Sequence, residues 1–308
     1  MRKSLLLVTL IVIMFNTASA QNFTRNTYDY VMRDSMLSMD VYKPLSVKNG
    51  ELNKTILYVF GGGFVTGDKR DEDNVEFFKI MVEKGYNVVA IDYRLGLKGV
   101  GKVSVLRPKA PYNAIYIATE DLISATKYII DNNEKLGVDT SKIVLMGSSA
   151  GAITVLRADY ELTNRTDMVG ELPEEFRYAG VVSMAGALFT TTGKPKYKRE
   201  PAPTFMMHGT KDKVVFYKKV QLFNLCVTGT NNLTKIFQKN LFTYWTYRFV
   251  GSEHEVATFP REYMTDQIVD FIENLALARK QQQLDVLIYD SYVLEHFKSN
   301  VTLKNLYN

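Results

Sequence analysis

The pentapeptide Gly147-Ser148-Ser149-Ala150-Gly151 restricts the fold more than any other part of this sequence. It stands between a short apolar run at 143–146 and a segment of helical character that starts near Ala150. A tight turn from strand to helix leaves no room for side chains at its flanking positions, so glycine is needed there. Only Ser149 has glycine two residues before it and two residues after it. The pattern therefore predicts a nucleophile elbow that exposes the Ser149 hydroxyl; the alternative is a chance Gly/Ser turn.

Strands and helices alternate along the rest of the chain. Strands are predicted at 28–42 (two short strands with a turn at Asp34-Ser35), 55–60, 87–91, 143–146, 178–184, 204–207 and 241–250, the last being the final strand. Helices are predicted at 74–84, 115–132, from 150 onward, 214–226 and 262–280. Continuous apolar runs are typical of strands buried on both faces, and this alternation is typical of a parallel sheet covered by helices. The predicted fold class is therefore α/β.

The loops that follow the strands hold the next candidates, because sites in open α/β sheets lie at the carboxyl ends of the strands. Gly61-Gly62-Gly63 directly follows the strand predicted at 55–60. Glycines there let backbone N–H groups approach a substrate oxygen, which is how an oxyanion hole is made. A flexible turn is the plain alternative. The glycine spacings of phosphate-binding loops are absent at this position.

An acid and an imidazole follow later strands. Asp212 lies in the loop after the strand at 204–207, where a carboxylate can orient an imidazole; its alternative role is to cap the helix expected from Val214. His254 lies in the loop after the strand at 241–250 and completes the chain order Ser, Asp, His. The alternative is an ordinary surface histidine. Only two other histidines exist: His208, expected to be structural, and His296, in the C-terminal tail.

Composition narrows the function classes. The chain has 308 residues, 46% of them hydrophobic and 23% charged, which is typical of a soluble globular protein. The formal charge is only +5, and no dense Lys/Arg cluster indicates a nucleic-acid partner. The single cysteine, Cys226, excludes an intrachain disulfide and a cysteine-based zinc site.

The N-terminus has the pattern of a secretory signal peptide over residues 1–20. Arg2 and Lys3 precede an apolar stretch at 5–15, and Ala18-Ser19-Ala20 provides a small-residue cleavage site. As a helix, eleven residues are too short to cross a bilayer core of about 30 Å, which disfavours a membrane anchor. We expect a secreted or periplasmic protein with one domain over 21–308, in which 281–308 is a C-terminal tail.

These motifs together resemble the α/β-hydrolase superfamily, and more narrowly the secreted carboxylesterase and esterase/lipase group with an HGGG-type oxyanion loop. The resemblance runs from about residue 58 to 272 and departs at Phe60, where histidine often opens the oxyanion motif. It implies a mostly parallel eight-stranded sheet with helices on both faces and no metal or organic cofactor. It also implies a set of site residues: the triad Ser149, Asp212 and His254, and oxyanion-hole donors from Gly62 or Gly63 and Ala150.

The resemblance implies a serine esterase that forms an acyl-enzyme on a small-molecule or polysaccharide-linked ester. Acetyl or feruloyl groups on plant polysaccharide are the expected substrates by analogy of fold. A serine peptidase of the same fold and a non-catalytic binding module are the alternatives. Two regions could shape the pocket, 96–111 and 162–176. The tail, amphipathic around 284–294, could be a helix on the sheet edge or a dimer contact, and the oligomeric state stays open.

Overall fold

The computed structural model describes residues 22–47, 50–100 and 109–306. The predicted signal peptide lies outside these described residues, as does part of the loop at 96–111. Within the described residues, no helix has both the length and the apolar character needed to cross a membrane.

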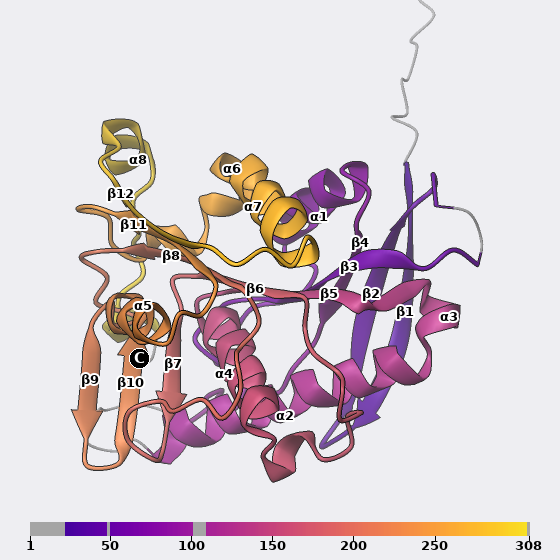
Figure 1. Ribbon diagram of the computed structural model, residues 1–308, viewed down its shortest axis with the longest axis horizontal. Coiled ribbons are helices and arrows are strands. Elements are labelled where there is room, and N and C mark those ends of the chain that lie inside the picture. The colour runs from indigo at the N-terminus through magenta and orange to yellow at the C-terminus, as the bar shows by residue number, and fades with distance from the viewer. Residues whose placement is uncertain (1–21, 48–49, 101–108, 307–308) are drawn as a thin grey trace, which may run out of the picture.

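A nine-stranded sheet forms the centre of the molecule, in the order β1-β2-β4-β3-β5-β6-β8-β11-β12 (Figure 1). The strands are β1 (Phe23–Met32), β2 (Met36–Pro44), β3 (Asn53–Val59), β4 (Asn87–Ile91), β5 (Val138–Ser148), β6 (Gly180–Met184), β8 (Thr204–Gly209), β11 (Tyr244–Phe249) and β12 (Gln283–Ile288). β1 and β2 pair antiparallel with each other, β2 pairs antiparallel with β4, and the pairs from β4 to β12 are parallel. The α/β fold class is confirmed, with one strand more than expected.

Helices cover both faces of this sheet (Figure 1). α2 (Lys109–Asp131) and α4 (Ala150–Asn164) lie on one face, and α1 (Glu72–Glu83), α6 (Pro260–Tyr263) and α7 (Thr265–Phe271) lie on the other. Every residue of β4, β6 and β8 is buried, as expected for strands covered on both sides. Aromatic contacts fix the layers, for example between Phe205 of β8 and Phe271 of α7, whose ring centres are 5.4 Å apart.

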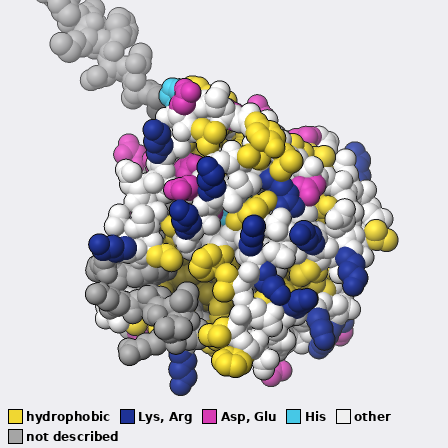
Figure 2. Space-filling view, turned by 90° about the vertical axis from the view of Figure 1, so that its left-hand side faces the viewer, with side chains coloured by type: hydrophobic (Ala, Val, Ile, Leu, Met, Phe, Trp, Pro, Cys, Tyr) yellow, Lys and Arg dark blue, Asp and Glu magenta, His cyan; other side chains and the backbone are white. Residues whose placement is uncertain are grey.

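The helix predicted at 214–226 is wrong. This segment forms a hairpin of β9 (Lys219–Leu222) and β10 (Leu225–Gly229), and β10 pairs with β7 (Ala187–Thr190) in a second, three-stranded sheet. The segment is rich in valine and aromatic residues, which favour strands, and the partner strand comes from a distant part of the chain. The helix comes later, as α5 (Thr230–Lys239). Lysine and arginine side chains are spread over the face seen in Figure 2, with hydrophobic ones between them.

The C-terminal region also differs from expectation. The strand predicted at 241–250 is not the last one, because β12 pairs in parallel with β11 and forms the edge of the sheet. The side chains of β12 alternate between exposed and partly buried, so the amphipathic pattern that begins at 284 belongs at first to a strand and not to a helix. The helix predicted at 262–280 is broken into α6, α7 and a π-helical turn at Ile272–Leu277. The other described helices are short: α3 (Asn133–Leu136), α8 (Ser291–His296), α9 (Leu303–Leu306) and two 3-10 turns, Asp167–Val169 and His254–Ala257.

Candidate active site

The turn between β5 and α4 has the geometry of a nucleophile elbow. Ser149, which lies between β5 and α4, has a backbone φ of +51°, a left-handed conformation that residues other than glycine rarely adopt. A Cβ atom at Gly147 would lie 2.4 Å from the Gly151 carbonyl, and one at Gly151 would lie 2.0 Å from the Val59 carbonyl oxygen of β3. Both glycines are therefore required by close backbone contacts.

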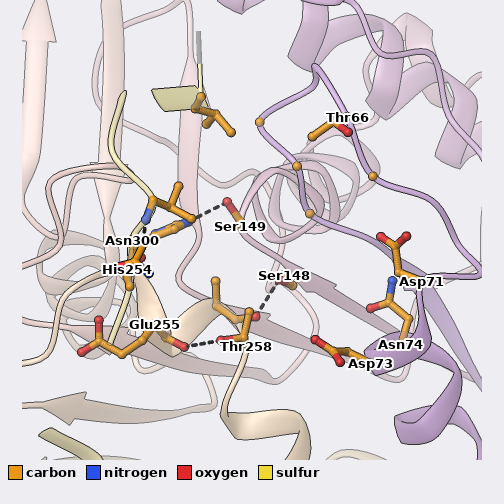
Figure 3. A pocket seen from close by; sticks show the side chains of 18 of the residues that line it. Thr66, Asp71, Asp73, Asn74, Ser148, Ser149, His254, Glu255, Thr258 and Asn300 are labelled. Atoms are coloured by element: carbon orange, nitrogen blue, oxygen red, sulfur yellow. Dashed lines mark hydrogen bonds between the residues drawn. The ribbon is translucent and has the colours of Figure 1, made fainter. Parts of the chain in front are cut away.

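The structure brings the three predicted triad residues together, and Figure 3 shows two of them, Ser149 and His254. The Ser149 Oγ lies 2.9 Å from His254 Nε2, and His254 Nδ1 lies 2.8 Å from Asp212 Oδ2. Ser149, Asp212 and His254 follow the carboxyl ends of β5, β8 and β11, and all three side chains are buried. This arrangement can transfer the hydroxyl proton of Ser149 to His254 while the carboxylate orients the imidazole.

Asp212 combines both functions that its sequence position suggested. Its Oδ1 accepts hydrogen bonds from the backbone N–H groups of Val214 and Val215, at 2.8 and 3.0 Å. The capping interaction thus exists, but it closes a turn, because no helix follows. Burial acts to raise the pKa of the Asp212 carboxyl, but the contacts with His208 and His254 outweigh it and hold that pKa well below its usual range. The carboxylate is therefore ionised at neutral pH.

His208 is closer to the triad than sequence reasoning expected. Its Nε2 lies 3.2 Å from Asp212 Oδ2, the same oxygen that His254 contacts. The side chain is fully buried at the end of β8. A signal was present in the sequence, because His208 stands four residues before Asp212, at the end of the strand that leads into the Asp212 loop.

The glycine loop lies against the elbow, as an oxyanion hole requires. A Cβ atom at Gly61 would lie 3.3 Å from Ser149 Cβ, and Gly62 has a φ of +117°. Ala150 is the first residue of α4, where backbone N–H groups lack partners within the helix. The structure thus places the glycine loop and Ala150 beside Ser149, and their role as oxyanion donors stays a prediction.

The departure at Phe60 has a structural explanation. The Phe60 ring packs on Tyr93, with ring centres 4.5 Å apart, and the Tyr93 hydroxyl donates a 3.0 Å hydrogen bond to the Phe60 carbonyl oxygen. The start of the glycine loop is therefore supported by aromatic packing and a tyrosine hydroxyl.

A pocket of about 630 Å³ opens over Ser149 and His254. One wall carries polar and acidic side chains from the loop before α1 and from its first turns, labelled in part in Figure 3: Thr66, Asp68, Asp71, Asp73 and Asn74. The C-terminal segment provides further lining: Lys298, Ser299, Asn300, Val301 and Leu306. Sequence reasoning missed both groups.

The C-terminal segment reaches the oxyanion loop itself. A Cβ atom at Gly63 would lie 2.4 Å from the Leu306 side chain, so Leu306 packs directly on this glycine. The regions predicted to shape the pocket, 96–111 and 162–176, contribute none of its lining among the residues that the structure describes.

The fold of this chain is similar to that of solved esterase structures. Esterase 2 of Thermogutta terrifontis phosphorylated by paraoxon superposes with a TM-score of 0.57 at 20% identity, covering 82% of this chain and 95% of that one. Esterase B of Lactobacillus rhamnosis gives a TM-score of 0.60 at 16% identity, covering 85% and 88%. These two structures share their fold with this chain. The family model BD-FAE matches residues 39–188, just under half of the chain.

Curated relatives are similar to this chain over part of its length. Acetylcholinesterase 1 of Caenorhabditis elegans is 32% identical over 124 residues, 40% of this chain and 19% of that protein. Mouse carboxylesterase 5A is 28% identical over 136 residues, which are 44% and 22% of the two chains. Esterase LipI of Mycobacterium tuberculosis is 32% identical over 111 residues, 36% of this chain and 30% of that protein. The chain thus spans less than a third of the length of these relatives.

Proposed function

We propose that this α/β-hydrolase is a serine esterase that cleaves carboxylic esters through an acyl-enzyme intermediate. One observation carries the proposal: Ser149 Oγ lies 2.9 Å from His254 Nε2, and His254 Nδ1 lies 2.8 Å from Asp212 Oδ2. Ser149 and His254 also line an open pocket. Similarity to proteins named as esterases, lipases and carboxylesterases supports the ester bond as the target.

The mechanism follows from the positions of these groups. His254 takes the proton of Ser149 as the hydroxyl attacks the ester carbonyl. Backbone N–H groups of Gly62 or Gly63 and of Ala150 hold the oxyanion. His254 then gives the proton to the departing alcohol and activates the water that releases the acid from Ser149.

The lining of the pocket supports a hydroxyl-rich alcohol portion, and we propose an acetyl or feruloyl ester on polysaccharide as the substrate. Asp68, Asp71 and Asp73 line the pocket wall, and two of them already accept backbone N–H groups. Carboxylates are acceptors only, so they suit the hydroxyl donors of a sugar better than a long acyl chain. We propose that the enzyme acts outside the cytoplasm, which fits both a polysaccharide substrate and the signal-peptide pattern of residues 1–20.

The ester proposal is tested with p-nitrophenyl acetate and butyrate, comparing wild type with Ser149→Ala. We expect kcat to fall by about 10⁴-fold or more. Ser148→Ala is the matched control, because the Ser148 Oγ donates only to the Ala257 carbonyl oxygen, and it should keep activity within about tenfold. A wild type that cleaves neither ester and takes up no paraoxon on Ser149 would refute the proposal. Faster cleavage of the matching p-nitroanilide would favour the peptidase.

The substrate proposal needs a separate assay. Acetic acid release from acetylated xylan, and ferulic acid release from feruloylated arabinoxylan, should exceed release from tributyrin. The double variant Asp71→Asn/Asp73→Asn should raise KM for the polysaccharide about tenfold and leave p-nitrophenyl acetate unaffected. Asp34→Asn, at an exposed position in the β1–β2 turn, is the control. Equal loss on both substrates would show that these carboxylates do not contact the sugar.

A further inference from the structure

We propose that His208 is a positioning residue of the triad, which holds the Asp212 carboxylate in place and limits its pull on His254. The inference rests on the proposed function, because it assigns a role within the same site. It starts from a simple observation: two imidazoles approach one carboxylate oxygen. His254 Nδ1 lies 2.8 Å from Asp212 Oδ2, and His208 Nε2 lies 3.2 Å from it.

The surroundings of His208 determine where its hydrogen lies. Nε2 faces two oxygens that only accept, the Val215 carbonyl at 3.0 Å and Asp212 Oδ2 at 3.2 Å. A nitrogen without a hydrogen would be repelled by both, so Nε2 carries the hydrogen. Nδ1, 2.8 Å from Thr230 Oγ1, can then accept from that hydroxyl. The imidazole is thus held at both nitrogens.

This arrangement closes a small ring around the catalytic acid. Val215 donates its N–H to Asp212 Oδ1, and its carbonyl accepts from His208 Nε2. His208 therefore fixes the loop that carries Asp212 and places a positive hydrogen near the other carboxylate oxygen. Partial neutralisation of that oxygen weakens its attraction for a protonated His254.

The other charged groups near the pair have separate partners, are exposed or line the pocket. The Tyr217 ring meets His208 edge-on at 5.5 Å, and its hydroxyl is bound by Arg248. Glu255, beside His254, accepts the N–H of Glu253 through its carboxylate. Lys211 and Lys213 flank Asp212 but are exposed. Further charged side chains line the pocket: Asp68, Asp71, Asp73, Arg261 and Lys298.

The test is an NMR titration of the histidine rings, which requires no substrate. The chain has three histidines, so His296→Gln assigns one signal, and the signal lost in His208→Phe separates His208 from His254. In His208→Phe, which keeps an aromatic ring but has no N–H, the pKa of His254 should rise by about one pH unit. In His208→Gln, whose amide can still donate, it should return to within about 0.3 of wild type.

Kinetics provide the second measurement. His208→Phe should lower kcat for p-nitrophenyl acetate about tenfold with little change in KM. It should also move the acidic limb of the kcat–pH profile to higher pH. His208→Gln should restore both the kcat value and the position of this limb. Loss of folding stability alone would move neither the limb nor the His254 titration. If His208→Phe does not fold, Thr230→Val, which removes the hydroxyl at Nδ1, should move the His254 titration upward by a smaller amount.

The outcomes separate this inference from the proposed function. A His254 pKa that stays unchanged in every folded variant overturns the role of His208, whatever the activity. A wild type that hydrolyses no ester overturns the esterase proposal, while the titration still decides the inference.

Discussion

Replacing Gly151 with alanine tests whether close packing between helix α4 and strand β3 sets the catalytic geometry. The new Cβ would lie 2.0 Å from the Val59 carbonyl oxygen and 2.6 Å from the Phe60 carbonyl oxygen. Real Cβ atoms essentially never lie closer than 3.0 Å to such a neighbour, so α4 must move away from β3 by roughly 1 Å. Backbone atoms cannot rotate aside, so the cost is at the upper end of overpacking, about 3 kcal/mol.

Ser149 moves with the helix, since it directly precedes α4. A displacement of about 1 Å lengthens its 2.9 Å contact with His254, and misplacement of that size lowers kcat about 100-fold. Urea unfolding and p-nitrophenyl acetate kinetics measure the two effects. Gly170→Ala is the control: Gly170 has a helical φ of −58°, and the added Cβ would meet only the Asp167 carbonyl oxygen, at 3.3 Å. A Gly151→Ala protein with wild-type stability and kcat would refute the packing argument.

Three further predictions address charge and the pocket. Asp212→Asn should lower kcat by about 10⁴-fold. The lowered pKa of Asp212 stabilises the folded state at pH values above about 3.9, the pKa of an aspartate in the unfolded chain, and this stability is lost as the pH falls below that value. The unfolding free energy of Asp212→Asn should therefore decrease less than that of wild type when the solution is acidified. An equal decrease in both proteins would contradict this. Burial raises the pKa of Asp159 to about 7, so ionisation of this carboxyl costs the wild type stability as the pH rises from 4 to 8. Over that range the Asp159→Asn variant should gain up to about 4 kcal/mol of unfolding free energy relative to wild type. Urea unfolding of both proteins at pH 4 and pH 8 checks this, and a difference that stays constant between the two pH values would refute it. Leu306→Ala should enlarge the space above Gly63 and raise kcat/KM for p-nitrophenyl hexanoate relative to acetate by about fivefold, and an unchanged ratio would show that this side chain does not limit the substrate.

Much of the fold could be predicted because its signals are local. The strand predicted at 87–91 begins and ends at the residues expected, and the helix after the elbow begins at Ala150 as expected. Buried strands of a parallel sheet are short apolar runs, which stand out against polar loops. The predicted triad order placed Ser149, Asp212 and His254 at strand ends, and parallel strands bring such ends to one edge of the sheet.

The incorrect predictions depended on partners far away in the sequence. The segment at 214–226 has residues that suit a strand as well as a helix, and it becomes a hairpin because β7 offers an edge for pairing. The strand β12 lies beyond the segment expected to close the fold, and its pairing with β11 is a tertiary contact. Local patterns cannot report such contacts.

The sequence by itself determined the α/β alternation, the elbow and the residue types of the triad, because glycine spacing and apolar periodicity reflect short-range sterics and burial. Only the tertiary structure decided what surrounds that triad. The contact of His208 with Asp212 and the packing of Leu306 on Gly63 both depend on how separate loops meet in space. The walls of the pocket, and with them the choice of substrate, come from segments whose sequence carries no catalytic motif, because long-range packing brings them together.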